Sequence, residues 1–494
     1  MQTHPTIKLV ILFLIATAVS ACMSPENPKG KDRQNEQTES QSKKPLKSVD
    51  TRIVDEGQEE TDREGAETVV GDTASLQATI KNLQQNKPFA LHIPAGYNDE
   101  EEAPVIFIFD PHARGGLAVN KYSDLADEFG FALVGSNQSK NNQPIEDGLK
   151  YYRDMKSGIK NRVEIDSDRI YTMGFSGGAR VAVSIAIQET EVQAAIGCGA
   201  GFPAIQRMPS PEFYYFGMVG YEDFNMGELI NNDRVLSRSE FDNELVIFDG
   251  GHDWPPEDVM REAFLALEIR HLAGTGKTDQ ALTTRVIDYY NTKIDAYTSE
   301  DRYFDAAETA ERAASVLDPI VNTDDFKSQM RSFKKNPRYR EDLSAMVRTM
   351  ERETGLQNNY LAAFENKGPD WWKGEIEKLK TPVDDVFEER LNRRLEAFLG
   401  LMAYMMSGKA ISDRDFDQAK KTLEVYRLIE PVNPEHAYLG AVVMMELGNE
   451  KAAADYLEQA IVLGFNNVER LRRETAFDDM ERRQDFLEML SDTP

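Results

Sequence analysis

The chain has 494 residues, of which 40% are hydrophobic and 9% aromatic, so it can bury a sizeable core and is long enough for about two or three domains. Its formal net charge of −28 and pI near 4.7 argue against nucleic-acid binding, because that function needs a basic surface.

The first 22 residues have the features of an export signal. Lys8 precedes an apolar stretch at 9–19 that is too short to span a bilayer comfortably. The ending VSAC (19–22) resembles the lipobox of bacterial lipoproteins, in which the cysteine, here Cys22, is lipidated and becomes the new N-terminus. The resemblance implies a protein of the cell envelope with a lipid anchor in a bacterial membrane, on its periplasmic or its surface face. An ordinary secretory signal that happens to contain a cysteine is the alternative.

The chain has only two cysteines, and the second is Cys198. With Cys22 lipidated, Cys198 has no partner for an intrachain disulfide. It lies in the apolar run AAIGCGAGF, which predicts a small buried side chain.

Residues 23–70 are predicted to be a disordered tether, because almost nothing in them can be buried. From 71 to 273 the composition changes, and apolar runs rich in β-branched and aromatic residues recur. They are PFALHIP (88–94), APVIFIFDP (103–111), FALVGSN (131–137), RIYTMGF (169–175), VQAAIGCGAGF (192–202), EFYYFGMVG (212–220) and ELVIFDGG (244–251). Amphipathic segments separate several of them, which predicts a mostly parallel sheet with helices on both faces.

Residues 274–494 read as helices, and their last part contains a repeat. The segment FDQAKKTLEVYRLIEP (416–431) resembles the second helix of a tetratricopeptide (TPR) repeat, and 437–465 has small or apolar residues where a second such repeat needs them. Ala419 and Ala453 are the matched small positions, 34 residues apart, which is the period of this repeat. The pattern is clearest over 400–466, although Ala-rich helical hairpins can imitate it. TPR-like repeats imply a protein partner on this domain.

The stretch YTMGFSGGARVA (171–182) places Ser176 between glycines, after a predicted strand and before a predicted helix. Gly-x-Ser-x-Gly at a strand–helix junction is typical of a nucleophile elbow. A plain tight turn is the alternative, while a phosphate loop is disfavoured because no Lys-Ser/Thr follows the glycines.

A serine nucleophile needs a base, which is usually histidine. The chain has six histidines: His4, His92, His112, His252, His271 and His436. His252 fits the role, since it follows the last predicted strand in a Gly-Gly-His-Asp-Trp-Pro turn. A turn histidine without a role is the alternative.

The acid that orients the base is expected after the intervening strand, in the order Ser, acid, His. That strand ends in GYEDFN (220–225), so Asp223 is the better candidate and Glu222 is the neighbour that could be mistaken for it. An aspartate at a strand end can also cap a helix.

Two backbone N–H groups are expected to form an oxyanion hole. One belongs to Gly177, the residue after the serine. The other is expected from the loop FDPHARGG, where Pro111 has no N–H, so that His112 or Ala113 is the donor. His112 would then act through its backbone and not as a base.

Residues 86–273 resemble an α/β-hydrolase, closest to the compact esterases related to polyhydroxybutyrate depolymerases, feruloyl esterases and dienelactone hydrolases. The resemblance lies in GFSGGA at the elbow, Gly-x-x-Asp-Phe-Asn at the acid and Gly-His-x-Trp-Pro at the base. The chain departs from these relatives at Asp110-Pro111, where they usually have His-Gly.

The resulting hypothesis is a membrane-anchored serine hydrolase, most simply a carboxylesterase that forms an acyl-enzyme on Ser176 and needs no cofactor or metal. Its expected substrate is an ester, either soluble or attached to a polymer such as a polysaccharide. Two alternatives stay open: a serine peptidase of the same fold, and a TPR-type binding lipoprotein with a degenerate hydrolase domain.

Overall fold

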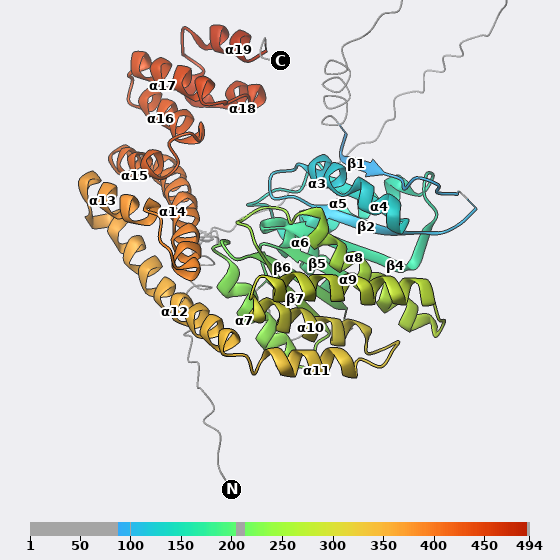
Figure 1. The fold of residues 1–494 in the computed structure, drawn as a ribbon. Helices are drawn as coiled ribbons and strands as arrows, with labels where there is room; N and C mark the ends of the chain where they lie inside the picture. The colour runs from blue at the N-terminus through green and yellow to red at the C-terminus, as the bar shows by residue number, and fades with distance from the viewer. Residues whose placement is uncertain (1–86, 99, 204–212, 492–494) are drawn as a thin grey trace, which may run out of the picture. The chain divides into compact units, whose positions relative to one another are not determined.

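The structure, a computed structural model, describes residues 87–98, 100–203 and 213–491 (Figure 1). The expected signal, the lipidation site Cys22, the tether and residues 71–86 lie outside the described residues. In the part of the chain that is described, no helix is both long and apolar enough to cross a membrane.

All seven apolar runs form strands of one sheet. The strands are β1 (Phe89–His92), β2 (Ala103–Phe109), β3 (Ala132–Ser136), β4 (Ile165–Phe175), β5 (Val192–Cys198), β6 (Tyr214–Gly220) and β7 (Asn243–Phe248). Their order across the sheet is β1-β3-β2-β4-β5-β6-β7, with β1 antiparallel to β3 and every other pair parallel. The predicted mostly parallel sheet is therefore confirmed.

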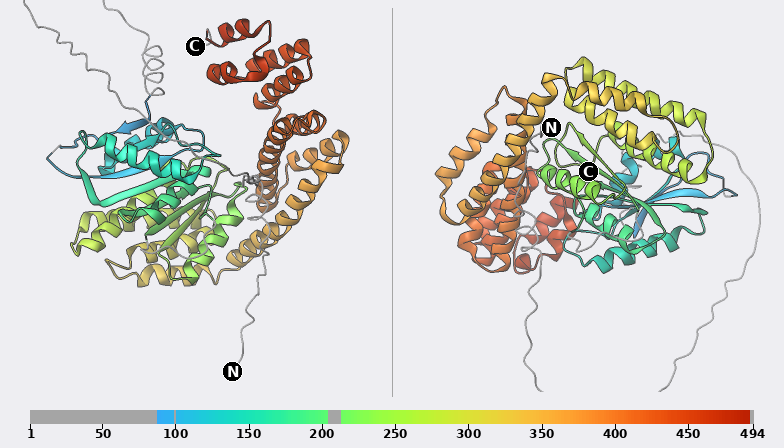
Figure 2. Two further views of the ribbon diagram at one scale, coloured as in Figure 1. Left: turned by 180° about the vertical axis from the view of Figure 1, so that it is seen from behind. Right: turned by 90° about the horizontal axis from the view of Figure 1, so that it is seen from below.

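Helices cover both faces of this sheet, as Figure 2 shows. They are α3 (Gly115–Lys121), α4 (Ser123–Phe129), α5 (Ile145–Ile159), α6 (Gly177–Gln188), α7 (Met226–Arg238) and α8 (Glu257–Thr275). Side chains alternate along each strand, so Ile106 and Ile108 of β2 pack with α3, α4 and α8, whereas Phe107 and Phe109 pack with α5 and α6. This explains why the strands read as continuous apolar runs, since neither face is left to water.

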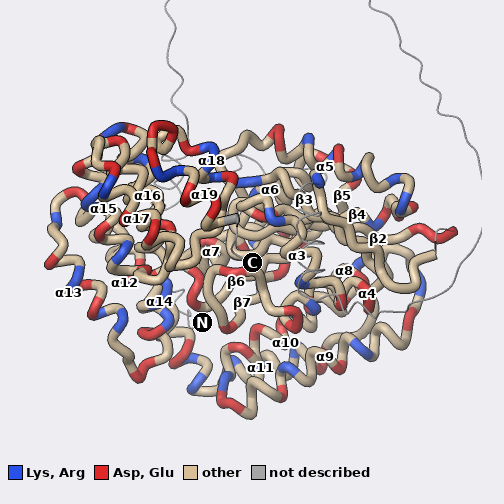
Figure 3. The backbone as a smooth tube through the Cα atoms, turned by 90° about the horizontal axis from the view of Figure 1, so that it is seen from above, with Lys and Arg blue, Asp and Glu red and all other residues tan. Residues whose placement is uncertain are grey.

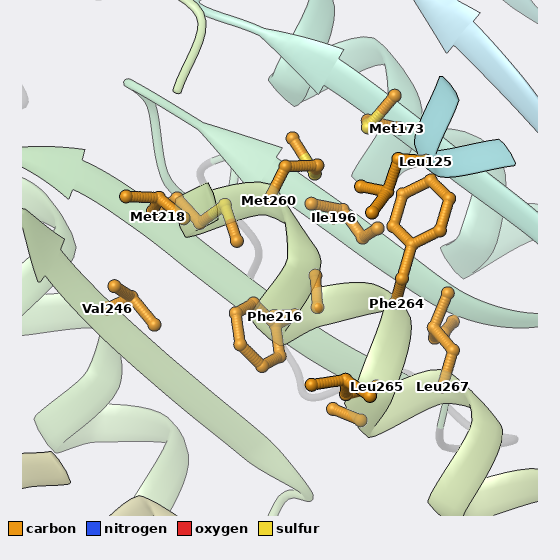
Figure 4. Packing of buried hydrophobic residues seen from close by; sticks show 14 of the residues in the cluster. Leu125, Met173, Ile196, Phe216, Met218, Val246, Met260, Phe264, Leu265 and Leu267 are labelled. Atoms are coloured by element: carbon orange, nitrogen blue, oxygen red, sulfur yellow. The ribbon is translucent and has the colours of Figure 1, made fainter. Parts of the chain in front are cut away.

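The core on the α8 side is dense and contains no charged strand residue at its centre (Figure 4). In Figure 4 apolar side chains of neighbouring strands lie against α8, among them Met173, Ile196, Phe216, Met218, Val246, Met260, Phe264, Leu265 and Leu267. Phe264 is fully buried, and burying such a side chain stabilises the fold by about 1.5–3 kcal/mol. Cys198 belongs to the same core and is buried, as predicted.

This core continues past residue 273, where sequence reasoning ended the sheet-bearing part. Helices α9 (Gln280–Ser299), α10 (Tyr303–Leu317) and α11 (Asp324–Phe333) add apolar side chains to the α8 side of the core. Glu262 of α8 is fully buried and pairs with Arg312 of α10 (2.8 Å) and Lys293 of α9 (3.0 Å). Burial alone would raise the pKa of Glu262, but the two cations outweigh it and lower that pKa to about 2.

A second core joins the remaining helices. They are α12 (Pro337–Asn366), α13 (Pro369–Lys380), α14 (Val386–Ser412), α15 (Phe416–Ile429), α16 (Glu435–Glu446), α17 (Glu450–Val462), α18 (Val468–Arg473), the 3-10 turn η1 (Thr475–Phe477) and α19 (Arg483–Ser491). Many of them begin at an Asp or Asn whose side chain accepts a hydrogen bond from the first turn, as at Asp385, Asp415 and Asn449. Figure 3 shows acidic and basic residues interspersed along helices such as α12 and α13.

The helix-rich character predicted for residues beyond 273 is confirmed, whereas their assignment as TPR repeats stays a prediction. The matched residues Ala419 of α15 and Ala453 of α17 are both fully buried. Gly448 has a φ of +72° between α16 and α17, a conformation that favours glycine at a helix end. Trp372 of α13 is buried in this core, as expected for a packing residue.

Candidate active site

Ser176 lies on a sharp turn between β4 and α6, at the carboxyl end of the sheet. Its backbone has φ 51° and ψ −121°, a conformation that a non-glycine residue rarely adopts. The N–H of Ser176 donates to the carbonyl of Cys198 at the end of β5 (2.8 Å), which holds the turn against the sheet.

The glycines around Ser176 allow backbone segments to approach one another closely. A Cβ on Gly174 would lie 2.1 Å from the carbonyl oxygen of Gly178, and a Cβ on Gly178 would lie 2.0 Å from the carbonyl oxygen of Phe109. Both positions therefore exclude any side chain, which is the physical reason for the GFSGG pattern.

The three side chains predicted to act together lie in one hydrogen-bonded row. Nε2 of His252 is 3.0 Å from Oγ of Ser176, and Nδ1 of His252 is 2.9 Å from Oδ2 of Asp223. His252 comes from the loop after β7 and Asp223 from the loop after β6. The row thus crosses the carboxyl ends of three parallel strands, where such a sheet collects its loops.

Asp223 is the deepest member of this row, with 1% of its surface exposed. Its Oδ1 accepts the N–H of Asn225 (2.8 Å), and the carboxamide of Asn225 donates to the carbonyl of Gly199 (2.8 Å). Glu222, the alternative acid, makes no hydrogen bond to His252 among the described residues and instead lines the hollow beside that histidine. The geometry therefore favours Asp223 over Glu222 as the partner of His252.

Apolar rings hold the imidazole in place. The rings of Phe175 and Phe224 lie 4.7 and 4.3 Å from that of His252, measured between ring centroids. The imidazole is part-buried, with 18% of its side chain exposed. Solvent or a ligand can therefore reach one edge of the ring while the other edge bonds Asp223.

Asp110, where the chain departs from its presumed relatives, is fully buried and joins two loops. It accepts hydrogen bonds from Nε of Arg114 (3.0 Å), from Nε1 of Trp254 (3.1 Å) and from the N–H of His112 (2.8 Å). Burial acts to raise the pKa of Asp110, but these hydrogen bonds outweigh it and leave the pKa below its ordinary value. Because Trp254 is two residues from His252, this carboxylate ties the loop after β2 to the loop of the base.

The N–H groups predicted as the second oxyanion donor are already engaged. That of His112 donates to the side chain of Asp110, and that of Ala113 donates to the carbonyl of Asp110 (3.2 Å). Gly177 differs, because it is the first residue of α6 and its N–H has no partner inside the helix. The ring of His112 is 65% exposed and makes no hydrogen bond within the described part of the chain, in keeping with the expectation that it is not the base.

Sequence reasoning did not anticipate Asn141, which lies in the loop after β3. A Cβ on Gly177 would be 1.8 Å from Oδ1 of Asn141, so the carboxamide packs directly on the backbone beside Ser176. No motif points to this residue, since the contact joins segments 36 positions apart in SKNNQ and FSGG.

Helix α14 also reaches the site. Arg394, 2% exposed, pairs with Glu353 of α12 (2.7 Å) and donates to the carbonyl of Tyr221 (2.7 Å), two residues before Asp223. A hollow of about 310 Å³ beside His252 is lined by Glu222, Gly251, His252, Arg393, Glu396, Ala397, Ile429 and Glu430. Residues of α14 and of the end of α15 therefore form one wall of the space next to the imidazole.

Comparison with known proteins adds three likenesses among solved structures. S-formylglutathione hydrolase FrmB from Staphylococcus aureus is 14% identical, with a TM-score of 0.30 over 34% of this chain and 82% of that one. Est1E from Butyrivibrio proteoclasticus is 13% identical, with a TM-score of 0.29 over 37% of this chain and 94% of that one. The acylaminoacyl peptidase from Pyrococcus horikoshii is 15% identical, with a TM-score of 0.27 over 33% of this chain and 35% of that one.

No family model matches the chain, and no curated protein sequence matches it. TM-scores of 0.27–0.30 carry no functional argument. The function is therefore argued from the geometry of the site.

Proposed function

We propose that the protein is an α/β-hydrolase that cleaves carboxylic esters through Ser176, His252 and Asp223. The observation that carries the proposal is the row of two hydrogen bonds, 3.0 and 2.9 Å long, that joins Ser176 on its strained turn to buried Asp223 through His252. A serine on an unstrained loop, or a histidine without a buried carboxylate behind it, would not support this chemistry.

In the proposed reaction Oγ of Ser176 attacks the ester carbonyl while Nε2 of His252 takes its proton. Asp223 keeps the proton of Nδ1 in place, so that Nε2 is free to accept, and it stabilises the imidazolium that forms. His252 then gives its proton to the leaving alcohol. Water repeats the sequence on the acyl-enzyme, which releases the acid and restores Ser176.

An ester is favoured over a peptide as the substrate, on grounds of chemistry. An alkoxide is a better leaving group than an amide anion, so ester cleavage makes the smaller demand on the oxyanion hole. The N–H groups of the loop after β2 are engaged with Asp110, which limits what that loop can supply. A substrate attached to a polymer, such as an acylated polysaccharide, belongs to the same proposal.

The first experiment exposes the full chain to a fluorophosphonate probe, which reacts covalently with activated serines. We expect labelling of the parent protein and none of Ser176→Ala or His252→Ala. Ser184→Ala is the matched control, since Ser184 lies on the same helix α6 away from the turn, and it should label like the parent. A folded parent that does not label, or a Ser176→Ala variant that does, contradicts the proposal.

The binding-protein alternative has one observation in its favour, the engaged N–H groups of His112 and Ala113. On that hypothesis GFSGG is retained for its shape, and α14–α17 hold a protein partner. It predicts a parent that folds normally and does not label with the probe.

The lipid anchor and the TPR partner are proposals as well. Lipidation predicts that a radiolabelled fatty acid is incorporated into the parent in a bacterial host and not into Cys22→Ser. A TPR-type partner predicts that a bound protein is lost when residues on the exposed faces of α15 and α17 are changed, while ester cleavage is retained.

A further inference from the structure

The proposed hydrolase has one evident oxyanion donor and needs a second. The N–H of Gly177 lies at the start of α6 without a partner inside the helix. The N–H groups of His112 and Ala113, in the position usual for the second donor, both donate to Asp110. A tetrahedral oxyanion bound through Gly177 alone would lack about half of its expected stabilisation.

The loop after β3 brings another donor to the same place. Its backbone is attached to the loop after β2, because the N–H of Asn141 donates to the carbonyl of Pro111 (2.9 Å) and Lys140 forms a β-bridge with His112. The side chain of Asn141 is thereby directed to the backbone of the elbow. It lies beside Gly177, the residue that follows Ser176.

The contact between Asn141 and Gly177 is intimate. Oδ1 and Nδ2 of Asn141 lie 1.8 and 3.5 Å from the point that a Cβ of Gly177 would occupy. Even an alanine at 177 would therefore push the carboxamide away. Among the described residues no hydrogen bond uses this carboxamide, and the residue is exposed, so a half-turn that exchanges its oxygen and its NH₂ group costs little.

We propose that the carboxamide of Asn141 is the second oxyanion donor, in place of the loop N–H groups. The inference rests on the proposed function. When Oγ of Ser176 bonds to the carbonyl carbon, the π pair of the C=O bond moves to its oxygen, and the proton of the serine moves to His252. The oxyanion then accepts one hydrogen bond from the N–H of Gly177 and one from Nδ2 of Asn141. Side-chain amides serve this purpose in other hydrolases, where removal of one donor costs roughly 10²–10³-fold in kcat.

The test compares three variants of the full chain on a chromogenic short-chain ester. Asn141→Ala removes the donor, and Asn141→Asp keeps the shape but replaces the donor with a negatively charged acceptor. Asn120→Asp adds the same charge at an exposed position on α3 and is the matched control. We expect kcat to fall about 10²-fold for Asn141→Ala and further for Asn141→Asp, with KM changed less than about 3-fold and Asn120→Asp equal to the parent.

A second measurement separates this role from a merely structural one. Phenylboronic acid forms a tetrahedral adduct on an activated serine, and its affinity should fall with kcat in the same order across the variants. Unfolding temperatures should not change, because the side chain of Asn141 is exposed and makes no hydrogen bond in the described structure.

The outcomes separate the two proposals. If the parent labels with fluorophosphonate and Asn141→Ala keeps kcat within about 3-fold, Asn141 is not a donor while the hydrolase stands. A loss of kcat for Asn141→Ala that Asn141→Asp restores would also overturn the inference, since a carboxylate cannot donate. A folded parent without labelling would overturn both proposals.

Discussion

Two loops at the carboxyl ends of the neighbouring strands β2 and β4 approach each other at the site, and they are built on opposite principles. The elbow after β4 is made of glycines and leaves the N–H of Gly177 without a partner inside α6. The loop after β2 is built around a buried carboxylate, and Asp110 binds the N–H of His112, the guanidinium of Arg114 and the indole of Trp254.

The difference teaches that a loop can be kept rigid in two ways with opposite chemical results. Close backbone packing around glycines, as at Gly174 and Gly178, holds the elbow without using its leading N–H group. A buried carboxylate holds its loop by attracting N–H groups, and those groups are then not available to a ligand. Asp110 thus serves as a connection to the loop of His252, and the free donor must come from elsewhere.

The largest expected effect is on the row behind the elbow. In Asp223→Asn an NH₂ group can face Nδ1 of His252, which favours the wrong tautomer, so kcat should fall about 10⁴-fold. The measurement is kcat near neutral pH on a short-chain ester. Glu222→Gln is the control, and a greater loss in that variant than in Asp223→Asn would exchange the roles of these two residues.

The close packing between the two loops can be broken at Gly178. A Cβ there would lie 2.0 Å from the carbonyl oxygen of Phe109, so Gly178→Ala should lower the free energy of unfolding by about 1–3 kcal/mol. Urea unfolding measures the change. The control is Gly116→Ala in α3, where the nearest atom is 3.7 Å away and no loss is expected. Equal stability of the two variants would contradict the packing argument.

Asp110→Asn tests the loop after β2. The substitution keeps the shape but removes the charge that Arg114 and the N–H of His112 bind, so the free energy of unfolding should fall by about 1–3 kcal/mol near neutral pH. The folded-state pKa of Asp110 lies below its ordinary value of 3.8, so its contribution is present above that pH and is lost as the pH falls through the folded pKa.

The difference in stability between the parent and Asp110→Asn should therefore shrink in acid, as measured by urea unfolding at neutral pH and below pH 3.8. A gap that stays constant would show that the charge is not what stabilises the loop. The value of kcat should change less in this variant than in Asn141→Ala.

The smallest effect is expected at the ring of His112. The ring is 65% exposed, and its Nδ1 lies 3.8 Å from Asp110, too far for a hydrogen bond. His112→Ala should keep kcat within about 3-fold, because only the backbone of this residue is held in the loop. A loss near that of Asp223→Asn would mean that the ring takes part in proton transfer.

Much of the fold was open to prediction because the signals are local. Each strand that is buried on both faces must be apolar throughout, so the seven runs and their parallel arrangement could be read along the chain. The helices after residue 273 were read correctly as helices, but not their partner. Whether α9 and α10 complete the core of the sheet depends on the pairing of Glu262 with Arg312 and Lys293, which no local pattern reveals.

The candidate site divides in the same way. The sequence alone determined the turn at Ser176 and the order in which Asp223 and His252 follow it, because a parallel sheet places the ends of successive strands along one edge. Only the tertiary structure decided which N–H groups at that edge are engaged, that Asn141 lies on Gly177, and that Arg394 of α14 holds the loop of Asp223. These are contacts between segments far apart in the chain, and their geometry depends on packing at the scale of an ångström, which residue types and spacing do not encode locally.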